Sequence, residues 1–179
     1  MRFFILMCIV FCVLFMVIGC GEKIQPSVLS TMDSGSLPQQ ESWNSTIVVS
    51  DSGHVSAIIL AGYIRVFEMS RQTQMSQGVR VRFFDTKGIQ TSVLTSEEGS
   101  VDEATNNLEA RKHVIVVSSD SSRMTTEQLF WNNQRALIHT PDFVEITTKK
   151  EKLQGRGFES DQSLKNYRIF RVTGQTQTD

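Results

Sequence analysis

Two stretches decide the fold, His113-Val114-Ile115-Val116-Val117 and Phe143-Val144-Glu145-Ile146-Thr147. Both are rich in β-branched residues, which favour β-strands. They occupy the same position in two copies of a repeat of about 30 residues, which starts at Leu94 and again at Met124. A third copy starts at Leu153. Such repeats predict supersecondary units that bury their apolar faces only by packing against their neighbours.

Glu145 assigns the two faces of these strands. Alignment of the repeats places it on Ile115, and because an unpaired buried carboxylate is costly, this face is predicted to meet water. Alternate residues then point inward, and Arg171 points outward. The predicted inward set is Val114, Val116, Leu129, Trp131, Ile138, Val144, Ile146, Phe170 and Val172. Such a stripe is either a packed core or, if every rung of an open roll shares it, a lipid-binding trough.

The residues before the repeat also have strand character. Val55 to Met69 is a long β-rich segment with a bend expected near Gly62, and Val79 to Phe83 alternates apolar and basic residues. Turn-forming residues separate these segments, at Asp51 to His54 and at Asp85 to Gly88. The regular spacing of strands and turns predicts an all-β sandwich, roll or β-solenoid.

The N-terminus has the pattern of an export signal. Met1-Arg2 precedes an apolar run from Phe3 to Ile18, which ends in Val17-Ile18-Gly19-Cys20. These last residues resemble the lipobox of bacterial lipoproteins, which predicts cleavage after residue 19 and lipidation of Cys20. The alternative is an uncleaved membrane anchor, although the run is slightly shorter than a typical span. Simple secretion after cleavage is a further alternative, and all three outcomes place the rest of the chain on the outer side of a membrane.

The composition of the remaining chain separates a linker, a folded domain and a short tail. Residues 20–45 are rich in Ser, Gln, Gly and Pro without an apolar period, and are predicted to be a flexible linker. Residues 46–175 are predicted to form one domain, with a tail at 176–179. The other two cysteines, Cys8 and Cys12, fall in the signal, so the mature domain is expected to hold together by core packing alone.

Charge and motif content exclude several functions. The chain has 18 basic and 19 acidic residues without a basic block, so nucleic-acid binding is not expected. The three histidines, His54, His113 and His139, lack metal-ligand spacing. No nucleophile motif or phosphate-binding glycine loop is present. The sequence therefore predicts no catalytic residue, no metal site, no cofactor and no enzymatic activity.

Several segments together resemble the C-terminal half of the LptC family, the periplasmic components of the lipopolysaccharide-export ABC transporter. They are Met124 to Trp131, Ile138-His139-Thr140, Phe143 to Thr147, and Leu153 to Asp161. The segments Thr91 to Gly99 and Asn107 to Ala110 also fit the family pattern. The resemblance covers about residues 47–174 and is looser before Arg82.

The resemblance implies an open, twisted β-jelly roll with a V-shaped section and an apolar inside. It implies lipopolysaccharide as ligand, with acyl chains in a trough lined by the predicted inward residues. The implied partners are the inner-membrane Lpt ABC transporter and the periplasmic bridge protein LptA, which docks by strand addition at the C-terminal edge. A lipid anchor would hold the protein on the periplasmic side of the inner membrane.

The candidate docking residues are Gly155, Gly157, Ile169 and Arg171. The two glycines either allow close backbone approach where the partner docks or form a bulge or tight bend. The lipobox-like end departs from the family, whose well-studied members keep an uncleaved N-terminal helix, so the resemblance does not extend to the role of that helix. An envelope lipoprotein of related fold that binds another lipid, or that serves in assembly, is the alternative function.

Overall fold

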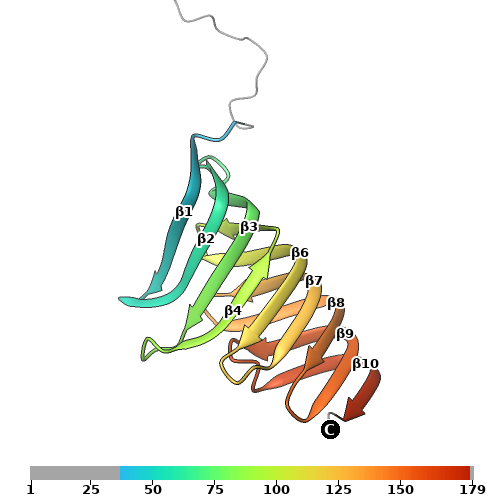
Figure 1. Cartoon of the computed structure of the whole chain (residues 1–179). Helices are drawn as coiled ribbons and strands as arrows, with labels where there is room; N and C mark the ends of the chain where they lie inside the picture. The colour runs from blue at the N-terminus through green and yellow to red at the C-terminus, as the bar shows by residue number, and fades with distance from the viewer. Residues whose placement is uncertain (1–36, 178–179) are drawn as a thin grey trace, which may run out of the picture. The chain divides into compact units, whose positions relative to one another are not determined.

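The computed structural model describes residues 37–177, which form one antiparallel sheet of ten strands (Figure 1). The strands are β1 Gln40–Asp51, β2 His54–Phe67, β3 Gln72–Phe84, β4 Gln90–Ser96, β5 Glu98–Asp102, β6 Asn107–Ser118, β7 Arg123–Asn132, β8 Leu137–Thr147, β9 Glu151–Asp161 and β10 Tyr167–Gln177. Their order follows the sequence, except that β4 and β5 lie one after the other between β3 and β6. The sheet is an open, twisted β-jelly roll, as predicted.

The long strands bend at a corner and continue in a second layer. The register of β2 shifts between Ala61 and Tyr63, which confirms the bend expected near Gly62. In β6 the corner is made by Lys112 and His113, which both have positive φ angles of 65° and 51°. Comparable register shifts interrupt β7 and β8. The corners fold one sheet into two facing walls.

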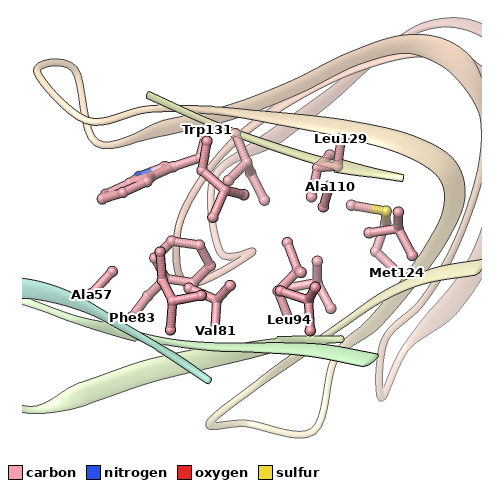
Figure 2. Packing of buried hydrophobic residues seen from close by; sticks show 14 of the residues in the cluster. Ala57, Val81, Phe83, Leu94, Ala110, Met124, Leu129 and Trp131 are labelled. Carbon is pink, nitrogen blue, oxygen red and sulfur yellow. The ribbon is translucent and has the colours of Figure 1, made fainter. Parts of the chain in front are cut away.

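We call these layers wall A and wall B. Wall A comprises residues 40–43, 63–67, 72–76, 98–102, 107–111, 128–132, 137–140, 158–161 and 167–169. Wall B comprises residues 45–51, 55–61, 79–84, 90–96, 114–118, 123–126, 143–147, 151–155 and 172–177. Figure 2 shows Ala57, Val81, Phe83 and Leu94 of wall B pointing toward Ala110, Leu129 and Trp131 of wall A.

The repeat of the sequence corresponds to a row of side chains inside wall B. Paired residues along this row are Ile47, Ile59, Val81, Leu94, Val116, Met124, Ile146 and Leu153, one from each successive wall B strand. All three repeat starts, Leu94, Met124 and Leu153, lie in it. The row therefore holds an apolar residue at the same height in each wall B strand from β1 to β9, and in β10 Gln175 occupies this position.

The first strand begins earlier than the sequence suggested. β1 starts at Gln40, within the segment expected to be a linker up to residue 45. Gln40 to Trp43 pair with Val66 to Tyr63 of β2, so these polar residues are held by main-chain pairing that composition does not reveal. The predicted signal, Cys20 and residues 1–36 lie outside the described residues.

Candidate functional site: the interior between the two walls

The interior is an apolar layer between the walls. Seven of the nine residues predicted to point inward are at most 1% exposed: Val114, Val116, Leu129, Trp131, Ile138, Val144 and Ile146. Alternation places them correctly because each stretch lies on one side of a corner. The sequence did not identify the residues that face them, such as Ile59 and Phe83, although alternation in Val79 to Phe83 had marked the strand.

Phe170 and Val172 are not buried, since they are 52% and 55% exposed, and for Phe170 the predicted inward orientation was wrong. β10 turns its corner between Ile169 and Val172, so simple alternation fails there. Ile169 pairs with buried Phe158 and packs against the core, whereas Phe170 points out of the roll. There the Arg168 guanidinium lies 4.6 Å from the centre of its ring. Val172 pairs with Gly155 on the inner side, but no later strand covers it.

The walls touch at the side opposite the corners, which we call the mouth. Trp131 of wall A meets Phe83 of wall B edge to face, with ring centres 5.0 Å apart. Beyond this pair the Ser56 hydroxyl donates a hydrogen bond of 3.2 Å to the Asn133 side-chain oxygen. These contacts join walls that are far apart in sequence, and they close the interior.

A pocket of about 530 Å³ lies outside these contacts. Its lining comes from four turns, two from each wall, and includes Val55, Phe84 and Ala136 among polar residues. One of these residues is Asp161, which is partly buried. Burial raises its pKa, but hydrogen bonds from Ser163, Asn166 and nearby backbone N–H groups outweigh this and keep the pKa below its usual value. The mouth therefore combines an apolar floor with a polar rim.

Three polar atoms inside the closed region have no hydrogen-bond partner. They are the Trp131 indole Nε1 and the Ser92 and Ser160 hydroxyls. Ser92 pairs with Phe83, and Ser160 pairs with Ile138 beside Trp131, so all three lie near the closing contact. Unpaired buried donors are costly, so closure of the mouth carries a free-energy cost.

The interior becomes more open toward both ends of the sheet. Ile47 at the β1 end and Leu153, Tyr167 and Ile169 at the β10 end are only partly buried. Burial and a hydrogen bond of 2.9 Å from its hydroxyl to Glu151 raise the pKa of Tyr167 to about 12. Tyr167 therefore stays neutral at physiological pH and presents an uncharged ring to the interior.

The two end strands each pair on one side within the described residues, β1 with β2 and β10 with β9. Ile169 and Arg171 lie on β10, as the docking prediction requires. Gly155 and Gly157 instead lie on β9, which pairs with both β8 and β10, so their assignment to the free edge was wrong.

The two glycines serve the corner of β9. A Cβ at Gly155 would lie 2.4 Å from the Arg171 carbonyl oxygen, and Gly157 has a φ of 75°. The close approach is to β10 of the same chain, which favours the tight-bend interpretation.

The described residues contain no cluster of three or more His, Cys, Asp or Glu that could hold a metal ion. Across residues 37–177 there is also no helix long and apolar enough to cross a membrane.

Fold and interior together define a class, the open single-sheet β-jelly rolls whose bent strands enclose an apolar layer and whose two end strands have free edges. The chain belongs to the lipopolysaccharide-assembly, LptC-related family, whose model matches residues 5–177. It is thus a component of lipopolysaccharide transport at the periplasmic side of the cell envelope, and this family is not one of enzymes. Comparison with curated proteins found no match.

Proposed function

We propose that this protein accepts the acyl chains of lipopolysaccharide from the inner-membrane ABC transporter and passes them to the periplasmic bridge protein LptA. The observation that carries the proposal is the aliphatic row in wall B, which runs without a charged residue from Ile47 in β1 to Leu153 in β9. A continuous row lets an acyl chain move from rung to rung without meeting a charge. The groove candidates are the seven buried residues, with Val172 at the open end.

Loading requires the walls to part at the mouth, because the contacts of Trp131 with Phe83 and of Ser56 with Asn133 close the interior there. Parting in water would expose apolar side chains, but an entering acyl chain replaces the lost contacts with new apolar ones. Removal of each methylene group from water contributes about 0.8 kcal/mol. The walls are therefore expected to open for a lipid and to close again when it leaves.

A photocrosslinking pair tests this function. A short diazirine-bearing side chain at Ile146, which faces inward, is expected to capture lipopolysaccharide in cells. The same side chain at the adjacent Glu145, which binds Lys152 and Gln154 on the outside, is expected to capture none. Equal capture at both positions would contradict the proposal, and capture of a different lipid at Ile146 would favour the related lipoprotein function.

Transfer to LptA is proposed at the free edge of β10. Consecutive residues of a regular strand point their N–H groups to opposite sides. Arg168 and Ile169 lie before the corner, where β10 pairs regularly with β9, so Arg168→Pro and Ile169→Pro are a matched pair. One removes a donor from the β9 pairing and the other removes a donor from the free edge. The free-edge variant should stay folded by circular dichroism and lose LptA in a pull-down. If both variants capture LptA at wild-type strength, docking does not use β10.

Lipidation of Cys20 is proposed as the membrane anchor, with the inner membrane as its location. Transfer from the transporter requires the roll to stay near that membrane. Two or more acyl chains give stable attachment where one gives only marginal binding. Intact mass of protein extracted from membranes should show loss of residues 1–19 and the added acyl groups. Detection of Met1 on the mature protein would show that the segment is retained.

A further inference from the structure

The outer face of wall B differs from an ordinary solvated β-surface. Two register rows on this face bring together six apolar side chains: Val48, Ile58, Leu60, Val93, Ile115 and Val117. They alternate with buried neighbours such as Ile59, Leu94 and Val116, and therefore point away from the interior. Val48, Leu60 and Val117 are 57%, 37% and 38% exposed.

Three arginines lie within the same two rows. Arg82 pairs with Ile58 and Val93, Arg80 pairs with Leu60 and Thr95, and Arg123 pairs with Val117. The Arg82 Nε atom is buried without a hydrogen-bond partner. Within residues 37–177 no carboxylate lies within salt-bridge distance of any of the three. We call the six apolar residues and these arginines the arginine face.

Acidic side chains are missing from this part of the two rows. From β1 to β7 the remaining members are Thr46, Thr95 and Thr125. The first carboxylate along the rows is Glu145 in β8, and Lys152 and Gln154 already bind it. Glu145 also interacts electrostatically with Arg123. Within residues 37–177 the arginine face therefore presents Arg80 and Arg82 on an aliphatic surface without a carboxylate in salt-bridge distance, and Arg123 lies at its border with Glu145.

The outer face of wall A provides an internal contrast. Its central row contains three carboxylates and two guanidinium groups, from Glu41, Arg65, Glu109, Glu159 and Arg168, so both signs of charge occur along it. Its side chains also bind one another: Arg65 donates to Gln74, and Gln128 donates to Glu109. Wall A thus has the polar, charge-balanced surface expected of a sheet facing water, and wall B does not.

We infer that the arginine face docks on the surface of an anionic phospholipid bilayer. Guanidinium groups without carboxylate partners attract lipid phosphates, and the aliphatic side chains between them enter the interfacial region. The inference rests on the membrane anchoring proposed above, which keeps the roll within reach. About 20 residues separate Cys20 from the start of β1, and such a chain spans at most roughly 70 Å.

Docking would set the orientation of the roll. With wall B against the bilayer, the mouth between the walls lies beside the membrane surface rather than facing open solvent. Lipid transport through the interior does not use any residue of the arginine face, so the two functions can be separated by substitution.

Fluorescence quenching in vesicles tests the inference. Full-length protein is purified in detergent and reconstituted into phosphatidylcholine vesicles that contain phosphatidylglycerol and a nitroxide-headgroup lipid. A fluorescent noncanonical amino acid is placed at Val117 in the arginine face, or at His139 on the outer face of wall A as control. Quenching is expected at Val117 and not at His139, and it should weaken in phosphatidylcholine alone and at high salt.

Charge removal gives the quantitative arm. Each cationic side chain near an anionic membrane surface raises the ratio of docked to undocked protein about fivefold. Three arginines together therefore raise this ratio roughly a hundredfold. The triple variant Arg80→Gln, Arg82→Gln, Arg123→Gln should lower the docked-to-undocked ratio by about this factor. Its control, Arg65→Gln, Arg135→Gln, Arg168→Gln, loses the same charge elsewhere and should leave the ratio nearly unchanged.

The outcomes separate docking from anchoring. Protein that stays with the vesicles on flotation but shows no quenching at Val117, or equal quenching at His139, overturns the docking. Equal loss of quenching in both triple variants overturns it as well, since net charge rather than the arginine face would be responsible. Protein that leaves the vesicles altogether overturns both the anchoring and the docking.

Discussion

Replacement of Trp131 tests how the interior is closed at the mouth. Trp131 is 1% exposed, its ring meets Phe83, and its indole N–H has no partner. Two substitutions separate these features. Trp131→Ala removes the whole ring and leaves a cavity, whereas Trp131→Phe keeps an aromatic ring and removes the unpaired N–H.

The expected magnitudes differ widely. Loss of a buried aromatic ring costs about 3–5 kcal/mol, including the cavity term. For Trp131→Phe, the smaller ring loses about 1–2 kcal/mol of packing, but removal of an unsatisfied buried donor recovers about 1–3 kcal/mol. Trp131→Phe should therefore lie between about 1 kcal/mol less stable and about 2 kcal/mol more stable than the wild type. Trp131→Ala should lower Tm by roughly 10–20 °C in a domain of this size.

Urea denaturation followed by far-ultraviolet circular dichroism measures both free energies of unfolding. A cost for Trp131→Phe as large as that of Trp131→Ala would refute the reasoning, because it would mean that the indole N–H is satisfied in solution. A cost below about 1 kcal/mol for Trp131→Ala would refute the closed packing at the mouth. In the proposed mechanism, a weakened mouth contact should also increase capture of lipopolysaccharide by the diazirine at Ile146.

Three further predictions concern the edge, the turns and the anchor. Gly155→Ala should destabilise the domain by several kcal/mol, because the new Cβ meets the Arg171 carbonyl oxygen, whereas Gly174→Ala meets only the Gln154 side chain and should cost about 1 kcal/mol or less. A hydrogen bond from Ser118 and one from the Ser122 backbone lower the pKa of Asp120 from its usual 3.8 to about 2. The resulting stability is present above pH 4 and lost as the pH falls toward 2. Asp120→Asn should therefore cost about 1 kcal/mol at pH 7 after allowance for solvent screening, and almost nothing near pH 2 in the same denaturation assay. Cys20→Ala should move the protein into the soluble fraction or leave it uncleaved, and unchanged processing and membrane attachment would exclude lipidation at this position.

Much of the fold follows from the sequence because strand alternation is a local property. Side chains of a strand point to opposite faces in turn, so Glu145 was sufficient to place Val144 and Ile146 inside. The repeat carried this assignment to Val114 and Val116, since equivalent rungs occupy equivalent positions. The strands and turns before the repeat were found by the same local patterns, and the family resemblance supplied the jelly roll.

The tertiary structure alone decided the corners, the closure and the edges. Lys112 and His113 adopt positive φ angles without a glycine to signal them, and the corner of β10 turned Phe170 outward against the local pattern. Contacts such as Phe83 with Trp131 join residues far apart in the chain, and no local pattern encodes such a pairing. The family resemblance singled out Gly155, but only the paired strands on both sides of β9 show that it serves a bend rather than a free edge. Each of these features depends on which distant strands meet, and that is set by packing of the whole sheet.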